Sequence, residues 1–253
     1  MKKLLALAQI VEEDPLRYRF HIDPFFRDRS DKRENTKCVR SLALPMKYKD
    51  VAGALLFVAG IVAIMGIITA EATYPGYSTA QNDISDLGAT RPPNSTIKQP
   101  AATIFAATLV VAGLLLIGGA LCTYRAFGNS RSSGLLALFL ALFGVGAIGV
   151  ALFNGSNDAS LVVHTLFALL TFSAGAIAAI AASVVVRSPF RYISIVLGVI
   201  ALAGLVLVIV FGDVNPVFSA IGNGGAERWI AYPSVLWVIG FGGYLMGAPA
   251  NAE

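Results

Sequence analysis

The segment Val51–Ala70 reads VAGALLFVAGIVAIMGIITA, a run of twenty residues without a charged side chain. About 20 consecutive apolar residues are enough for an α-helix to cross the hydrocarbon core of a bilayer. The run is apolar on every face rather than along one stripe, as expected of a helix that is surrounded by lipid and by other apolar helices. The segment therefore predicts a membrane-spanning helix.

Five further runs of the same kind follow along the chain. They are Ala101–Tyr124, Gly134–Phe153, Leu161–Val186, Tyr192–Phe211 and Trp229–Gly247. The composition agrees with them, because 56% of the 253 residues are hydrophobic and only 13% are charged, too few to cover the surface of a soluble domain. The sequence predicts an all-α polytopic membrane protein in which residues 46–248 form a six-helix bundle, followed by a short tail at 249–253.

The first 45 residues differ from the rest, because they mix basic and acidic side chains densely with scattered aromatic residues. The opening resembles a signal peptide, but its apolar stretch ends at Glu12 and no small-residue cleavage site follows. Met46 stands just before Lys47, Lys49 and the first apolar run, an arrangement with which many inner-membrane proteins begin. We therefore interpret residues 1–45 as a cytoplasmic extension, disordered or produced by a start-site error, and Met46 as the natural start.

The basic residues are unevenly distributed between the loops. One side of the predicted membrane carries three pairs: Lys47 and Lys49, Arg125 and Arg131, Arg187 and Arg191. The other side carries only Arg91, Lys98 and Arg228. Because Lys and Arg concentrate on the cytoplasmic side, the sequence predicts a multi-pass protein of the cell (cytoplasmic) membrane with both termini in the cytoplasm. The net charge of +4 comes from basic residues that are concentrated in the first 40 positions and beside the apolar runs, so membrane lipids rather than nucleic acid are the expected partners.

The loops predicted to lie outside, 71–100, 154–160 and 212–228, hold most of the acidic residues that follow the N-terminal extension. These residues are Glu71, Asp83, Asp86, Asp158, Asp213 and Glu227. The enrichment predicts a polar pocket that faces outward. The alternative is that the inner loops are simply too short to hold many polar residues.

Asp83 and Asp86 lie three positions apart in the polar loop. If 79–87 formed a short helix ending at Gly88, both carboxylates would point the same way. Such a pair can coordinate a cation, receive a basic group or share a proton, and it can equally cap a turn. Near the last apolar run, Glu227 is followed by Arg228, which could pair with either aspartate or hold a phosphate in a bidentate manner.

His164 is the only histidine among the predicted helices, about one turn below the outer boundary of the fourth. An ionisable side chain inside a membrane span is costly and often marks a functional position. Alternatively, a histidine so near the interface can be solvated or paired with a neighbour such as Asp158. One histidine is too few for a bis-histidine haem, and Cys38 and Cys122 do not have a metal-ligand spacing, so we expect no metal and no cofactor.

Several of these features together resemble a known family. They are Tyr77, the run from Asp83 to Gly88, Asn94-Ser95, His164, the Gly224-Gly225-x-Glu227-Arg228 segment and Trp237. Over roughly Lys49 to Gly247 the chain resembles the prokaryotic integral membrane family DUF998, which is uncharacterised. The resemblance implies a six-helix membrane protein and no particular activity. The chain is more distantly similar to the Frag1/DRAM/Sfk1 group of membrane proteins, which are tied to lipid handling.

Three functional interpretations follow from the sequence. The first is an outward pocket that binds a lipid headgroup or a small polar solute, with the candidate residues Asp83, Asp86, His164, Asp213, Glu227 and Arg228. The second is an enzyme on lipid-linked substrates, with His164 or an aspartate as general base and Arg228 holding a phosphate. It requires His164 within about 3 Å, or one water, of a carboxylate and open to a cavity. The third is a structural protein, in which every outer charge is paired and no cavity exists.

The predicted spans are also rich in small residues, which allow helix backbones to approach closely in lipid. The third span holds Gly144, Gly146 and Gly149, and the fourth holds Gly175 among several alanines. We expect them to pack the helices of one bundle, although a homo-oligomer could also form through one of these faces.

Overall fold

The computed structural model describes residues 48–128, 130–212 and 216–247, and these residues form helices and loops without any strand. The long helices are α3 (Tyr48–Ala72), α4 (Ala101–Phe127), α5 (Arg131–Leu152), α6 (Asp158–Ala182), α7 (Phe190–Phe211) and α8 (Gly222–Gly247). Each is long and apolar enough to cross a membrane. The prediction of an all-α protein with six membrane-spanning helices is therefore confirmed.

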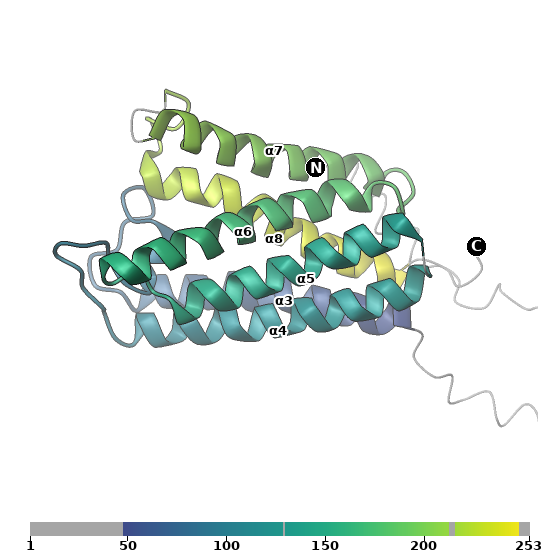
Figure 1. The fold of residues 1–253 in the computed structure, drawn as a ribbon, viewed down its shortest axis with the longest axis horizontal. Coiled ribbons are helices and arrows are strands. Elements are labelled where there is room, and N and C mark those ends of the chain that lie inside the picture. The colour runs from purple at the N-terminus through teal and green to yellow at the C-terminus, as the bar shows by residue number, and fades with distance from the viewer. Residues whose placement is uncertain (1–47, 129, 213–215, 248–253) are drawn as a thin grey trace, which may run out of the picture. The chain divides into compact units, whose positions relative to one another are not determined.

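Successive helices run up and down and pack against their neighbours in the chain (Figure 1). Helix α8 returns to pack against α3, α6 and α7. The largest fully buried side chains include Trp237 and Phe241 on α8 and Leu136 and Leu140 on α5. Helix α8 thus supplies much of the core of the bundle.

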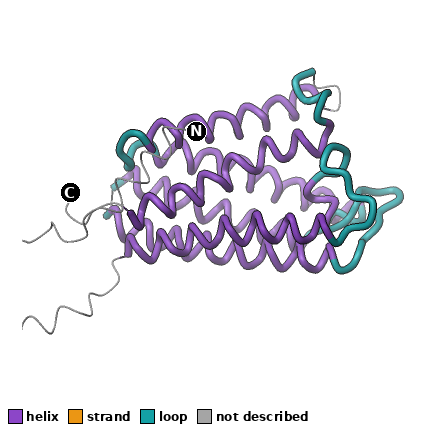
Figure 2. The backbone as a smooth tube through the Cα atoms, turned by 180° about the vertical axis from the view of Figure 1, so that it is seen from behind, coloured by secondary structure: helices purple, strands orange, loops and turns teal. Residues whose placement is uncertain are grey.

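The long loop 73–100 and the loop segments 153–157 and 216–221 gather at one end of the bundle, which we call the loop end (Figure 2). At the opposite end of the bundle, the indole N–H of Trp237 donates a hydrogen bond of 3.0 Å to the Ser194 hydroxyl near the start of α7. That bond joins two helices within the apolar layer.

Small residues allow the helices to approach closely, as the sequence indicated. Gly113 on α4 faces Gly144 on α5, where a Cβ on either glycine would lie 2.6 Å from the carbonyl oxygen of the other. Gly146 and Gly149 face Thr171 and Phe167 on α6 in the same way. These glycines pack the helices of one bundle, and the possible homo-oligomer stays a prediction.

Two helix boundaries differ from the predicted ones. Helix α6 ends at Ala182 rather than at Val186, because the backbone turns after Ser183, whose hydroxyl bonds to the carbonyl of Ile180. Helix α8 begins at Gly222 rather than at Trp229, so Glu227 and Arg228 lie within the helix. Hydropathy locates the apolar part of a helix, but the polar first turns depend on contacts with other segments.

The predicted boundaries at 45/46 and 248/249, and the proposed start at Met46, lie outside the described residues. The described helices belong to one compact unit, Pro45–Glu253.

We expect Gly144→Val to destabilise the protein by about 1–3 kcal/mol, because the added side chain would overlap the backbone of α4. Thermal unfolding of the purified protein in detergent measures this. The matched control is Gly243→Ala on α8, where a Cβ has no neighbour within 4 Å. An unchanged melting temperature for Gly144→Val would contradict the close packing of α4 on α5.

Candidate functional site

Arg228 on α8 holds the loop end together. One terminal nitrogen of its guanidinium, Nη2, donates to Glu71 Oε1 at 2.5 Å and to the Tyr77 hydroxyl at 2.8 Å. The Arg228 and Glu71 side chains are only 12% and 16% exposed. Because a largely desolvated guanidinium needs both a counter-charge and acceptors for its N–H groups, this pair fixes the end of α3 against α8.

The other terminal nitrogen of Arg228 binds backbone. Nη1 donates to the carbonyl oxygens of Thr79, Asn82 and Gly224, at 2.9, 3.2 and 2.7 Å. The first two carbonyls belong to the long loop, and the third belongs to the first turn of α8. Arg228 thus attaches the loop to the helix and supplies donors to two carbonyls of the loop.

Tyr77 extends this cluster. Its hydroxyl accepts from Arg228 and donates to the carbonyl of Asp83 at 2.8 Å, and its ring lies 5.6 Å from the Arg228 guanidinium carbon. Burial raises the pKa of the Tyr77 hydroxyl well above its usual value. The hydroxyl therefore keeps its proton at neutral pH and remains a donor to the loop.

Two glycines allow the loop to lie directly on α8. The Gly224 amide donates to the carbonyl of Ala80 at 3.0 Å, and a Cβ on Gly224 would lie 2.1 Å from the carbonyl oxygen of Asn82. Gly222 has a φ of +70°, and a Cβ there would lie 2.2 Å from the Ala80 oxygen. Only glycine fits this approach and this backbone conformation.

The two loop aspartates do not form a carboxylate pair. Asp86 Oδ2 accepts from the Asp83 amide at 3.1 Å and from the Asn82 side chain at 3.2 Å, which closes the turn around η2 (Ile84–Leu87). Asp83 Oδ2 instead pairs with Arg91 at 2.6 Å. The helix considered for 79–87 is thus only the short 3₁₀ helix η2, because the Asp86 side chain folds back on the residues before it.

Glu227 precedes Arg228 in the sequence but faces a different partner. Its carboxylate accepts a hydrogen bond from the backbone amide of Ile84, at the start of η2. Neighbouring positions on a helix point about 100° apart, so Glu227 and Arg228 reach different parts of the loop. Glu227 lines the cavities described below.

His164 on α6 is 7% exposed, and its Nδ1 lies 2.6 Å from the carbonyl oxygen of Phe153. Because a carbonyl can only accept, Nδ1 carries the proton, and Nε2 is the remaining hydrogen-bonding atom of the ring. The expected alternative partner, Asp158, is not the one that the ring uses. The bond to Phe153 fixes the ring against the end of α5.

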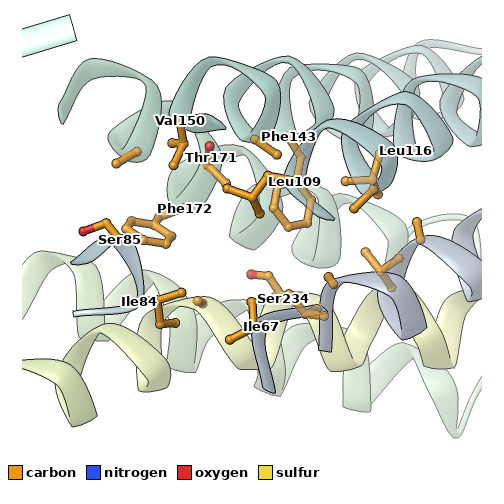
Figure 3. Close-up of a pocket in the computed structure, with 18 of the residues that line it drawn as sticks. Ile67, Ile84, Ser85, Leu109, Leu116, Phe143, Val150, Thr171, Phe172 and Ser234 are labelled. Carbon is orange, nitrogen blue, oxygen red and sulfur yellow. The ribbon is translucent and has the colours of Figure 1, made fainter. Parts of the chain in front are cut away.

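Two cavities meet at these residues. The larger, of about 680 Å³, is the α6–α7 cleft, which lies between these helices, the first turns of α8 and the loop. The smaller, of about 90 Å³, is the interior cavity among α3, α4, α5, α6 and α8 (Figure 3). Both are lined by Ser85, His164, Ala168, Phe172 and Glu227. The cleft is polar near the loop, and the interior cavity is almost wholly apolar.

The structure therefore divides the predicted site residues into three groups. Asp83, His164 and Glu227 line the α6–α7 cleft. Asp86 and Arg228 are bound within the loop cluster and do not line it. Asp213 lies outside the described residues.

Sequence reasoning missed the partners of these residues. The sequence indicates Glu71 only as one of the outer acidic residues, and it suggests Asp83 or Asp86 as the partner of Arg228. The structure pairs Arg228 with Glu71. Ser85 lines both cavities, but it stands inside a turn motif in which serine is common. Among the described residues, no group of three or more His, Cys, Asp or Glu side chains is placed to hold a metal ion.

A family model described as a protein of unknown function (DUF998) matches residues 57–244. Neither the search of curated proteins nor the search of solved structures found a match.

We expect Arg228→Gln to lower the free energy of unfolding by about 3 kcal/mol, because it leaves the Glu71 carboxylate uncompensated and removes donors from the loop carbonyls. Chemical or thermal unfolding in detergent measures the loss. The matched control is Arg91→Gln, whose ion pair with Asp83 is 64% exposed on the arginine side and should contribute less than about 1 kcal/mol. Equal losses in the two variants would contradict the central role of Arg228.

Proposed function

The chain belongs to the DUF998 family of membrane proteins of unknown function, and we propose that it binds an amphipathic ligand, a lipid of the surrounding bilayer, with the polar head of that lipid in the α6–α7 cleft. The observation that carries the proposal is the meeting of the two cavities at Ser85, His164 and Glu227. A polar wall at the mouth of an apolar interior suits a molecule with a polar head and an apolar chain.

The side chains around the cleft support a head with hydrogen-bond donors. The carboxylates of Asp83 and Glu227 and the ring of His164 line it, whereas Arg91 is the one cationic side chain among its described lining residues. A zwitterionic head fits this arrangement if it takes over the ion pair of Asp83 and Arg91, with its ammonium group at Asp83 and its phosphate at Arg91.

The position of the cleft supports entry from the membrane. Its walls include Leu169 on α6 and Ile209 on α7, whose side chains are largely exposed on the outside of the bundle. In a bilayer, such surfaces contact acyl chains. A lipid can thus reach the cleft sideways, without crossing a polar barrier.

The distribution of basic residues supports an outward position for the loop end. The opposite end carries Lys49, Arg125, Arg131, Arg187 and Arg191, as expected for the cytoplasmic side. We therefore place the cleft in the outer leaflet of the cytoplasmic membrane, with both termini inside.

The geometry favours binding over the two alternatives. The His164 Nδ1–H donates to the backbone carbonyl of Phe153 and not to a carboxylate, which is the contact that the enzyme interpretation requires. A purely structural role would leave no cavity, whereas the cleft and the interior cavity together adjoin the polar residues. The contacts of Arg228, by contrast, fit the third interpretation, because its charge is paired with Glu71 inside the protein.

We expect the native protein, isolated in detergent-free membrane discs, to retain a lipid that mass spectrometry identifies. Glu227→Gln and His164→Ala should each lower the retained amount about tenfold, because the first replaces the carboxylate of the wall that holds the head by a neutral amide and the second removes the imidazole from that wall.

The matched control is Asp158→Asn, an exposed acidic position one turn and a half from His164 that lines neither cavity. Its lipid content should equal that of the native protein. Identical lipid content in all four proteins would contradict the proposal.

A further inference from the structure

We propose that the interior cavity receives part of an acyl chain of the lipid bound in the α6–α7 cleft, and that the Ser234 hydroxyl donates a hydrogen bond to the ester carbonyl of that chain. The inference rests on the proposed function and names the ligand class more narrowly, as an ester-linked lipid.

Ser234 on α8 carries a buried hydroxyl group that lacks a partner within the described residues. Its side chain is 1% exposed, and its oxygen has no hydrogen-bond partner within the described residues. By contrast, the hydroxyl groups of Thr171, Ser173 and Ser194 each donate to the carbonyl four residues earlier, at 2.6–2.9 Å. That local bond is the usual solution for a serine in a membrane helix.

Ser234 lines the interior cavity, and its oxygen is almost wholly covered by neighbouring atoms. Figure 3 shows Ser234 on the α8 side of the cavity, across from Thr171 and Phe143. Gly175 on α6 lies directly behind it, where a Cβ would be 3.0 Å from the Ser234 Cβ. A buried hydroxyl without a partner costs free energy, and it costs more in a membrane, where water is scarce. A ligand with an oxygen acceptor at this point removes the cost.

The depth of Ser234 fits a lipid whose head lies at the mouth of the cavity. Ser234 is seven residues after Glu227, which is about 10 Å along the helix. Val238, also on the cavity wall, is about 16 Å from Glu227. Since the hydrocarbon core is about 30 Å thick, the cavity extends over about the depth of one leaflet. Below the head of a membrane lipid, the common oxygen acceptor is the ester carbonyl.

The volumes of the cleft and of the interior cavity indicate which part of the lipid each can hold. The interior cavity, about 90 Å³, has room for about three groups of the size of a water molecule. It can therefore hold only the ester carbonyl and the few atoms next to it, so the rest of that chain also lies in the larger cleft. The head and the second chain remain in the larger cleft, whose walls continue into the cavity at Ala168 and Phe172.

The test compares two lipids that differ only in the carbonyl. The delipidated protein is titrated with vesicles of phosphatidylethanolamine with ester-linked chains, or with the ether-linked analogue of the same chain length. The native protein should bind the ester lipid about fivefold more tightly, as expected for one net hydrogen bond. Ser234→Ala should remove this preference by weakening ester binding, and it should raise the melting temperature of the lipid-free protein, since a costly buried hydroxyl is gone.

The matched control is Thr171→Val, which removes a hydroxyl from the same cavity wall that already has a partner. It should keep the preference for the ester. Equal binding of ester and ether lipids by the native protein, or an undiminished preference in Ser234→Ala, would overturn the inference.

The two proposals fail differently. If His164→Ala loses both lipids while Ser234→Ala leaves the ester preference intact, the cleft binds lipid but Ser234 does not contact the carbonyl. If the native protein binds neither lipid, both proposals are wrong.

Discussion

A guanidinium that leaves bulk water must keep its charge balanced and its N–H groups occupied, and the loop end of this protein is arranged around that requirement. Arg228 meets it with one carboxylate, Glu71, one phenol, Tyr77, and three backbone carbonyls. These acceptors come from α3, from the long loop and from α8 itself. The polar first turns of α8 are therefore stable as a helix. The same contacts hold the loop so that η2 forms part of the cleft wall.

The polar residues of the loop end thus fall into two groups, those that fix the loop and those that line the cavities. Arg228, Glu71, Tyr77 and Asp86 have partners within the chain and fix its conformation. Ser85, His164 and Glu227 border the cavities. His164 and Glu227 also bond to the backbone, at the Phe153 carbonyl and the Ile84 amide, so their positions depend on that fixed framework. A change in the first group would alter the second group indirectly, by moving η2. Loss of binding in a loop variant is therefore informative only when the fold has been measured as well.

The sequence was sufficient for the six spans because the bilayer imposes a simple rule, about 20 apolar residues without charge. It was insufficient where a contact joins distant segments. Glu71 and Arg228 are 157 positions apart, and nothing near either one indicates the other. His164 could be singled out because a histidine is rare inside a span. Ser234 could not, because a serine among glycines and alanines is typical of close helix packing, and only the geometry shows that its hydroxyl lacks the usual bond.

The hydrogen bond between Trp237 and Ser194 has a consequence for α7. It anchors this helix at the end of the bundle opposite the loops, whereas the half of α7 that borders the cleft, around Leu205 and Ile209, is held by apolar contacts only in the described part of the chain. Opening the cleft by a pivot about the anchored end breaks no hydrogen bond between helices. The outer half of α7 can therefore shift against its neighbours more easily than the anchored end, and such a shift would change the width of the entrance.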